Sequence, residues 1–215
     1  MSSDLSTALI VIGFLGVMCL GVLIVFGLGY LFIVRPNIER TKVVNQNWEA
    51  FAREKGFTFA RGGYPRLDGT YRGREVRLAV VNPRYDFDGT TRFTPGQTSS
   101  SRIMLTRASA GIKDDSPDLT VYKRGLLDNL TKDQDLVLGN EAFDTKFRVL
   151  SGSPEWVKSI LTPEIQAALV ERQISLLASH KGTIQLNAVG IESRKEVLEA
   201  FLDLACRIAE AIERS

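Results

Sequence analysis

The sequence predicts an α+β protein: one N-terminal transmembrane helix, then a soluble domain in which helices pack on one face of an antiparallel sheet. Three observations lead to this fold class. Residues 8–34 form an apolar run without charge, strand patterns dominate the first part of the domain, and helical patterns come late in it. Strands and helices never alternate strictly, as they would around a parallel sheet. The sequence therefore divides into an extracytoplasmic tail (1–7), the transmembrane helix (8–34), a juxtamembrane connecting helix (35–56) and the soluble α+β domain (57–215).

The apolar run has the length of a membrane anchor. As an α-helix its 27 residues span about 40 Å, against about 30 Å for the hydrocarbon core of a bilayer. No Lys or Arg precedes it, and it exceeds the roughly 7–15 apolar residues of a secretory signal. We therefore expect an uncleaved anchor. Gly13, Gly16 and Gly27 fall on one strip of this helix, where two copies could approach and form a homo-oligomer. The simpler interpretation is that glycine is common in membrane helices.

Charged residues on the two flanks predict the orientation in the cell inner membrane. The tail 1–7 carries only Asp4, whereas Arg35, Arg40 and Lys42 follow the run. Positive charge is enriched on the cytoplasmic side of a membrane. We predict a single-pass protein with its N-terminus outside and its C-terminal domain in the cytoplasm. The alternative places the domain in the periplasm.

A connecting helix is predicted between the anchor and the domain. Trp48, Phe51 and Ala52 fall near one face of a helix over residues 38–55, and Gly56 provides a stop. We expect Trp48 and Phe51 to pack against the domain.

Alternating patterns predict two hairpins. Val76, Leu78 and Val80 alternate with more polar positions after the turn pair Arg72-Gly73, which is typical of a half-buried strand in a hairpin. Residues 174–178 and 183–188 are the second pair, turning at 180–182. Further strands are expected at 102–108 and 119–124, and a helical turn followed by a strand around Phe143 and Phe147.

Three helices are predicted late in the domain. Ser153-Pro154 and Thr162-Pro163 each place a capping residue before a proline, which predicts two short helices. Ser193 and Glu196 have the spacing of a capping box that opens the last helix. The apolar stripe of that helix comprises Val197, Phe201, Leu204, Ala205, Ile208 and Ile212.

Two stretches carry a recognisable pattern. Residues 67–73 read Leu-Asp-Gly-Thr-Tyr-Arg-Gly, and residues 143–149 read Phe-Asp-Thr-Lys-Phe-Arg-Val, followed by Leu-Thr-Pro-Glu at 161–164. Together they resemble a family of uncharacterised bacterial membrane-anchored proteins, in which membrane helices precede an α+β domain. The resemblance implies the same architecture here. It implies no reaction, because the family has no established activity.

Composition argues against several classes of function. The 27 basic and 25 acidic residues nearly balance, so nucleic acid is not expected as a partner. Two cysteines and one histidine are too few for a cysteine zinc site or a disulfide framework, and no metal or cofactor is expected. His180 is predicted to be a solvated turn residue, and Cys206 a passive thiol at the edge of the last helix's stripe. Asp86 and Asp88 begin a calcium-loop pattern that the following residues do not complete.

Basic residues are concentrated early in the domain. Residues 53–84 carry eight basic side chains against three acidic ones. The simpler interpretation is a solvated sheet face. The functional interpretation is attraction to anionic lipid headgroups or to an acidic protein, at about 1 kcal/mol for each basic residue near an anionic leaflet. The residues assigned to this surface are Arg35, Arg40, Lys42, Arg66, Arg72, Arg74 and Arg77.

Two functions follow from these patterns. The favoured one is a membrane-tethered, non-enzymatic interaction or scaffold domain at the cytoplasmic face, because the sequence holds no catalytic constellation. The alternative is a membrane-bound enzyme that works with carboxylates alone, for which Asp68, Asp144 and Glu141 are the candidates.

Overall fold

The computed structural model describes residues 35–61, 64–82, 104–112, 117–125, 135–180 and 182–215, together with a few single positions between 18 and 30. The chain divides into two compact units, residues 1–44 and 45–215. Within the described ranges, no helix combines the length and the apolar character needed to cross a membrane. The predicted anchor 8–34, with its glycine strip, lies almost entirely outside the described residues, as do Asp86 and Asp88. The anchor therefore stays a prediction.

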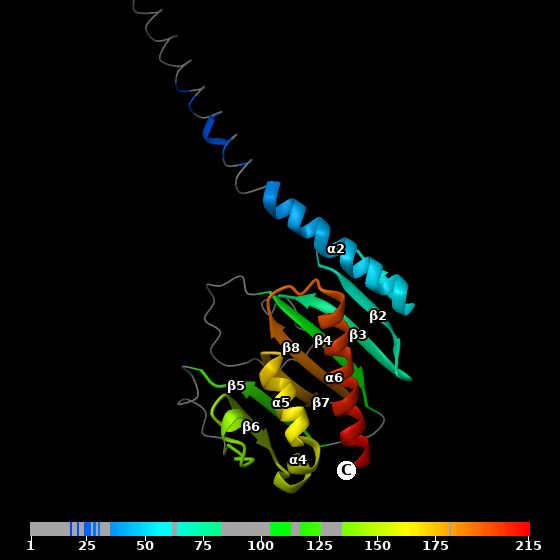
Figure 1. Ribbon diagram of the computed structural model, residues 1–215, viewed down its shortest axis with the longest axis vertical. Helices are drawn as coiled ribbons and strands as arrows, with labels where there is room; N and C mark the ends of the chain where they lie inside the picture. Colours follow the sequence, from blue (N-terminus) through cyan, green and yellow to red (C-terminus); the bar gives the residue numbers. More distant parts are fainter. Residues whose placement is uncertain are drawn as a thin grey trace, which may run out of the picture. The chain divides into compact units, whose positions relative to one another are not determined.

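In the part of the chain that the structure describes, eight strands form one antiparallel sheet in the order β1-β2-β3-β4-β8-β7-β5-β6 (Figure 1). Each strand pairs with its neighbours in antiparallel fashion, so the predicted α+β class with an antiparallel sheet is confirmed. The strands are β1 Thr58–Ala60, β2 Arg66–Tyr71, β3 Arg74–Val81, β4 Leu105–Gly111, β5 Leu119–Lys123, β6 Phe147–Ser151, β7 Ile174–His180 and β8 Thr183–Val189.

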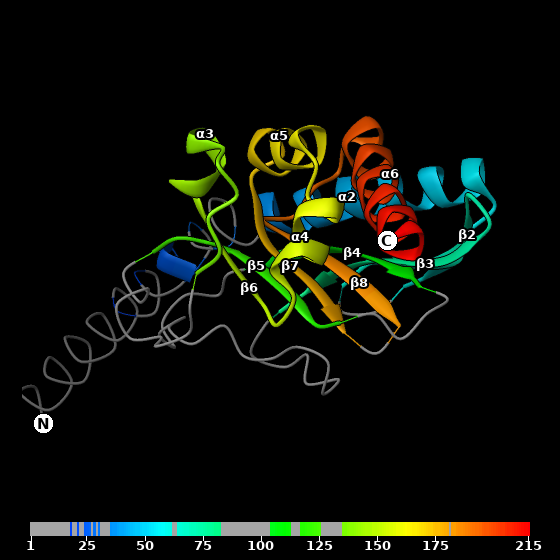
Figure 2. The same ribbon diagram turned by 90° about the horizontal axis from the view of Figure 1, so that it is seen from below.

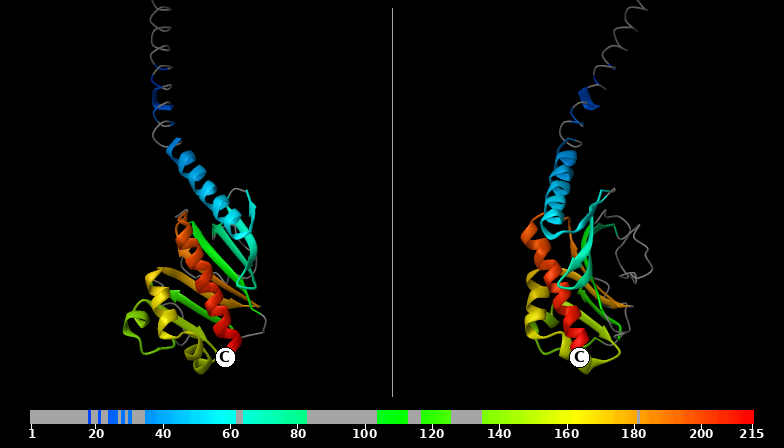
Figure 3. Two further views of the ribbon diagram at one scale, coloured as in Figure 1. Left: turned by 45° about the vertical axis from the view of Figure 1, so that its right-hand side comes forward. Right: turned by 90° about the vertical axis from the view of Figure 1, so that its right-hand side faces the viewer.

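Helices cover one face of this sheet (Figures 2 and 3). The long helix α6 (Lys195–Arg214) packs on β3, β4 and β8, and α5 (Pro163–Glu171) packs on β7. The shorter helices α3 (Glu141–Asp144) and α4 (Pro154–Ile160) lie on the same side. The predicted stripe of α6 is buried there at Phe201, Leu204, Ala205, Ile208 and Ile212, which places the core between this helix and the sheet.

The first hairpin forms where the sequence predicts it. Arg72 and Gly73 have φ values of 51° and 74°, and a two-residue loop with both φ values positive matches the twist of the strands on either side. The turn fixes the register, so that Leu67 pairs with Leu78. Gly69 is needed in β2 because a Cβ atom there would stand 2.3 Å from Cδ1 of Phe57.

The second half of helix α2 (Arg35–Lys55) belongs to the 45–215 unit. Trp48 and Phe51 are both 0% exposed, and the Trp48 indole donates a 2.7 Å hydrogen bond to the carbonyl oxygen of Glu192. The helix is closed by Gly56, which has a φ of 72°. The predicted helix and the packing of Trp48 and Phe51 are therefore confirmed.

The predicted capping box of the last helix is wrong. Helix α6 begins one residue later than expected, and its N-cap residue is Arg194, whose side chain makes no capping bond. The Glu192 carboxylate instead accepts the backbone N–H groups of Ser193 at 2.9 Å and Arg194 at 2.8 Å. Glu192, which precedes the helix, therefore takes the capping role that the sequence pattern assigned to Ser193 and Glu196.

Other elements differ from the sequence-based expectations only in detail. Ser153 and Thr162 do precede prolines at the starts of α4 and α5, but neither side chain makes a capping hydrogen bond. Strand β4 ends at Gly111, three residues beyond its predicted end. Phe143 and Phe147 lie on α3 and β6 as expected, with their rings stacked at 4.9 Å between centroids.

The outer edge of β6, which no other strand of the described residues pairs with, is hydrogen-bonded to the segment that precedes α3. Leu136 donates its backbone N–H to the Val149 carbonyl at 3.0 Å, and Val149 donates its own N–H to Asp135 Oδ1 at 3.0 Å. The Asp135 carboxylate is also held by Arg124. The outward backbone groups of Val149 are thus satisfied without a further strand, as edge strands require.

Candidate functional site

The candidate site lies on the face of the sheet opposite the helices, which we call the open face. Successive side chains of a strand point to opposite faces. On β3, Val76 and Leu78 point to the helices and are at most 6% exposed, whereas the Arg77 side chain points the other way and is 56% exposed. No helix of the described ranges lies on this face (Figure 2). The open face therefore presents polar side chains such as Arg77, next to a small buried apolar cluster of Ala79, Val81 and Leu105.

The open face is hollowed over β2, β3, β4 and β8. The hollow has a volume of about 1000 Å³, at the upper end of the size of small-molecule sites. The small residues Ala79, Ser109 and Gly111 on β3 and β4 line it, which leaves room above the sheet. Longer side chains surround them: Tyr64, Arg66, Asp68, Glu75, Arg77 and Gln185.

Asp68 is the centre of the polar part of the hollow. Its Oδ2 atom lies 2.8 Å from Nε of Arg66, and its Oδ1 atom accepts a 2.6 Å hydrogen bond from Nε of Arg77. The two arginines are about half exposed, at 52% and 56%, and the Asp68 side chain is 32% exposed. Two of the predicted basic residues are thus brought together, with a carboxylate between them.

A second polar group lies deeper on the open face. Arg107 donates from Nε to Asn187 Oδ1 at 3.0 Å, and the two residues are only 5% and 2% exposed. Gln185, in the next row of the sheet, is 7% exposed. Buried polar groups are generally held by hydrogen bonds, as Arg107 and Asn187 are here.

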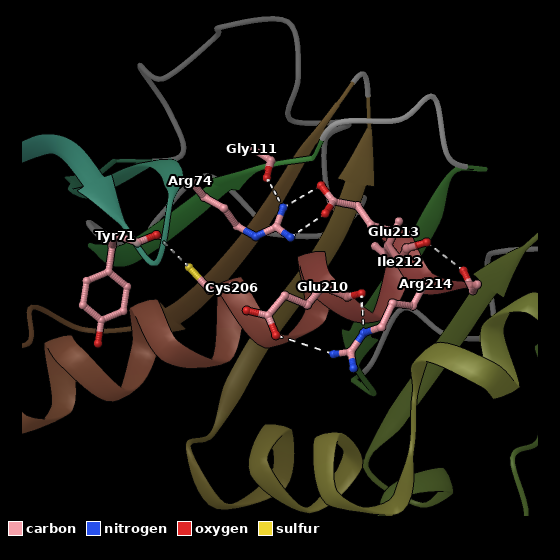
Figure 4. A network of polar contacts seen from close by, with 9 residues as sticks. Tyr71, Arg74, Gly111, Cys206, Glu210, Ile212, Glu213 and Arg214 are labelled. Atoms are coloured by element: carbon pink, nitrogen blue, oxygen red, sulfur yellow. Dashed lines mark hydrogen bonds and ion pairs between the residues drawn. The ribbon is translucent and has the colours of Figure 1, made fainter.

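Arg74 lies on the opposite side, against helix α6 (Figure 4). Its guanidinium makes a two-pronged ion pair with Glu213, with Nη1 to Oε1 at 2.6 Å and Nη2 to Oε2 at 2.5 Å, and it also donates to the Gly111 carbonyl at 3.2 Å. The Arg74 side chain is only 9% exposed. The hydrogen bond with Glu213 raises the pKa of Arg74 further. This arginine ties the end of β3 to α6.

The neighbouring turn is tied to the same helix. Arg72 pairs with Asp203 at 2.9 Å, and the Tyr71 hydroxyl donates to the Asp203 carboxylate at 2.9 Å. Lys55 from α2 reaches Glu199 at 2.6 Å. Burial, followed by the hydrogen bond with Asp203, raises the pKa of Tyr71 to about 12. The carboxylates of α6 were missed by the sequence analysis, because nothing local to 199–213 indicates which strand they face.

The remaining predicted basic residues lie in the first half of α2, in the other compact unit. Arg35 pairs with Glu39 one helical turn away at 3.1 Å, and both side chains are 62% exposed. Arg40 and Lys42 are exposed. The seven predicted residues thus divide into three sets: Arg66 and Arg77 on the open face, Arg72 and Arg74 against α6, and three on α2.

The candidate carboxylates of the enzyme hypothesis are not brought together. Asp68 lies on β2, near one end of the sheet, whereas Asp144 and Glu141 belong to α3, beside the strand at the other end. Asp144 accepts the backbone N–H groups of Leu138 at 3.1 Å and Gly139 at 2.9 Å, which is a structural role. Among the residues that the structure describes, no cluster of His, Cys, Asp and Glu is arranged to hold a metal ion.

The two other singled-out residues have structural partners. His180, predicted to be a solvated turn residue, has a side-chain partner: its Nδ1 atom lies 2.8 Å from Asp118 Oδ1. Cys206 is 0% exposed and its thiol faces the Tyr71 carbonyl at 3.8 Å, because the first hairpin covers that flank of α6. Burial raises the pKa of Cys206 to about 11, so it is a passive thiol.

Comparisons with known proteins support the fold. No family model and no curated protein sequence matches the chain. The crystal structure of the mycobacterial trehalose monomycolate transport factor A, TtfA, is similar with a TM-score of 0.53 and 9% sequence identity, over 78% of this chain and 93% of that chain. At this identity the likeness shows the fold alone. The resemblance to an uncharacterised family, which rests on residues 67–73 and 143–149, is therefore not supported by a matching family model.

Proposed function

We propose that this chain is a membrane-tethered, non-enzymatic binding factor whose domain binds its partner molecule through the hollow of the open face. The observation that carries the proposal is the hollow of about 1000 Å³, which is lined by the exposed Arg66 and Arg77 and the half-buried Asp68. A large concave site with a few convergent polar groups is the default place for binding in a protein of this size. The other face of the sheet is occupied by its own helices.

The likeness to TtfA is compatible with a binding role. That protein is named as a transport factor for trehalose monomycolate. In this chain the described helices leave one face of the sheet to the hollow (Figure 2). The proposal rests on the hollow of this chain and uses the likeness only as support.

A carboxylate-dependent enzyme is less well supported. General acid–base chemistry on two carboxylates needs both within reach of one substrate. Asp68 has arginine partners on the open face, and Asp144 holds backbone amides beside β6. No observation on the described residues favours this alternative.

The membrane part of the proposal rests on the sequence. Residues 8–34 would hold the domain at the cytoplasmic face of the inner membrane, and exposed Arg40 and Lys42 on α2 would meet anionic headgroups. A cytoplasmic reporter fused after Ser215 should be active. Signal from a periplasmic reporter at the same position would move the domain to the other side.

The binding role is tested by photo-crosslinking of the full chain in membranes. Thr70, which lines the hollow, is replaced by p-benzoylphenylalanine, and Glu171, exposed on α5, is replaced in a matched control. Irradiation should give an adduct from position 70 and none from position 171. Adducts from position 171 alone, or from neither position, would contradict a binding role for the open face.

A further inference from the structure

We propose that the hollow binds an uncharged polyhydroxyl group, such as a hexose unit, through Arg66, Asp68 and Arg77. This inference rests on the proposed function and names the ligand class of the same site. It comes from the arrangement of donors, acceptors and charge around Asp68.

The charge of the hollow is nearly balanced. Its lining includes three arginines, Arg66, Arg77 and Arg107, and two carboxylates, Asp68 and Glu75. An anion that contacted Arg66 and Arg77 together would lie beside Asp68, whose oxygens are 2.8 Å and 2.6 Å from the two Nε atoms. Like charges at such range repel. The site therefore disfavours a phosphate or carboxylate ligand unless Asp68 is displaced.

A hydroxyl group suits the same arrangement. Each hydroxyl both donates and accepts, whereas a carboxylate only accepts and a guanidinium only donates, with five N–H groups. Arg66 and Arg77 direct their Nε groups to Asp68, and each guanidinium has further N–H groups to offer. Neighbouring hydroxyls of a sugar would accept from a guanidinium and donate to the carboxylate. Hydrogen bonds with charged partners are the stronger ones.

The shape of the hollow fits a ring-sized ligand. The small residues Ala79 and Ser109 line the hollow, and Tyr64, which is 46% exposed, adds an aromatic side chain to its lining next to Pro65. Sites for small ligands combine such apolar surfaces with a few placed polar groups. Adjacent to them, Arg107 donates its hydrogen bond to Asn187 on the inner part of the open face.

The test uses the full chain in phosphatidylcholine nanodiscs, since many detergents carry sugar headgroups. Saturation-transfer NMR and titration are performed with maltose, with octyl glucoside below its micelle concentration, and with citrate. Maltose should bind and citrate should not. Similar affinity for maltose and the glucoside would assign the sugar alone, and tighter binding of the glucoside would assign a sugar headgroup on an apolar chain.

Asp68→Asn gives opposite results for the two ligand classes. For a polyhydroxyl ligand it removes a charged acceptor, and the affinity for maltose should fall about tenfold. For an anion it removes a repulsive charge, and the affinity should rise. Asp203→Asn is the matched control, because it removes a carboxylate paired with Arg72 on the other side of the sheet, and it should leave the affinity for maltose unchanged.

A second variant tests the same site in case Asp68→Asn fails to fold. Arg66→Lys with Arg77→Lys keeps both charges and removes both guanidinium forks, so it should also weaken maltose binding. Citrate binding that exceeds maltose binding, and that strengthens in Asp68→Asn, would overturn the proposal. So would the absence of any maltose binding. If the position-70 adduct still forms in that case, only the ligand class is wrong; if it is also absent, the proposed function fails too.

Discussion

The two faces of one sheet have opposite characters in this protein. On β3, Leu78 is 1% exposed beneath α6, and the next residue toward the turn, Arg77, has a side chain that is 56% exposed on the open face. The covered face is apolar at its centre and bordered by ion pairs to α6. The open face carries arginines around one carboxylate, beside a buried apolar cluster of Ala79, Val81 and Leu105. The exposed polar residues of the open face should therefore respond to substitution differently from the buried residues beneath α6.

The largest difference should come from adjacent residues of β3. Leu78→Ala removes a fully buried side chain and should lower the free energy of unfolding by about 2–5 kcal/mol. Arg77→Ala removes an exposed ion pair and should change it by less than about 1 kcal/mol. Urea unfolding of the fragment 35–215 measures both. Equal losses would mean that the open face is packed as tightly as the covered one.

The ion pairs of the two faces provide the next comparison. Glu213→Gln leaves the nearly buried Arg74 charge without its carboxylate and should cost about 3 kcal/mol. Asp68→Asn breaks the exposed pairs on the open face and should cost less than about 1 kcal/mol. The double variant Arg74→Met/Glu213→Leu should recover part of the loss, since it removes both charges together. A small effect of Glu213→Gln would show that water reaches Arg74.

Vesicle binding should distinguish the contribution of the basic residues on helix α2 from that of the arginines on the open face. We expect the fragment 35–215 to bind anionic vesicles weakly at low salt, and Arg40→Gln/Lys42→Gln to weaken this by about 2 kcal/mol, from about 1 kcal/mol for each residue. Arg66→Gln/Arg77→Gln should have little effect, because Asp68 already offsets both charges. Co-sedimentation measures the binding. A stronger effect of the open-face pair would assign the anionic contact to the hollow.

The smallest expected effect is on the covered face at high pH. The pKa of Tyr71 is raised from its ordinary 10.0 to about 12, so the protonated hydroxyl stabilises the fold fully below pH 10, and this contribution is lost as the pH rises through 12. Tyr71→Phe should cost about 1 kcal/mol at pH 8. The difference from wild type should shrink between pH 10 and 12. Tyr64→Phe, on the open face, is the control, and a constant difference for Tyr71→Phe would contradict the assignment.

Much of the fold was predictable because local patterns determine it. The period of Phe201, Ala205, Ile208 and Ile212 indicates a helix with one buried face, and Arg72-Gly73 indicates the turn of the first hairpin. The position of that turn also predicts one contact of the candidate site. Counting outward from it places Asp68 opposite Arg77, so this pair was within reach of the sequence.

The rest depended on contacts between distant segments. Arg74 and Glu213 are separated by 139 positions, and no local pattern shows that the end of β3 faces the last turn of α6. The capping box failed for the same reason, because Glu192 is held by Trp48 through its carbonyl and turns its carboxylate onto the amides of Ser193 and Arg194. The hollow was also missed, since small residues such as Ala79 and Ser109 give no periodic signal.

The closed side of β6 has a consequence for behaviour at high concentration. An edge strand with free backbone groups is a template on which identical chains can add, and fibrils grow in this way. Here the groups of Val149 that face outward are already bonded to Asp135 and Leu136. At this position of β6 no backbone group is left to pair with a further strand, which hinders the addition of an identical chain along that edge.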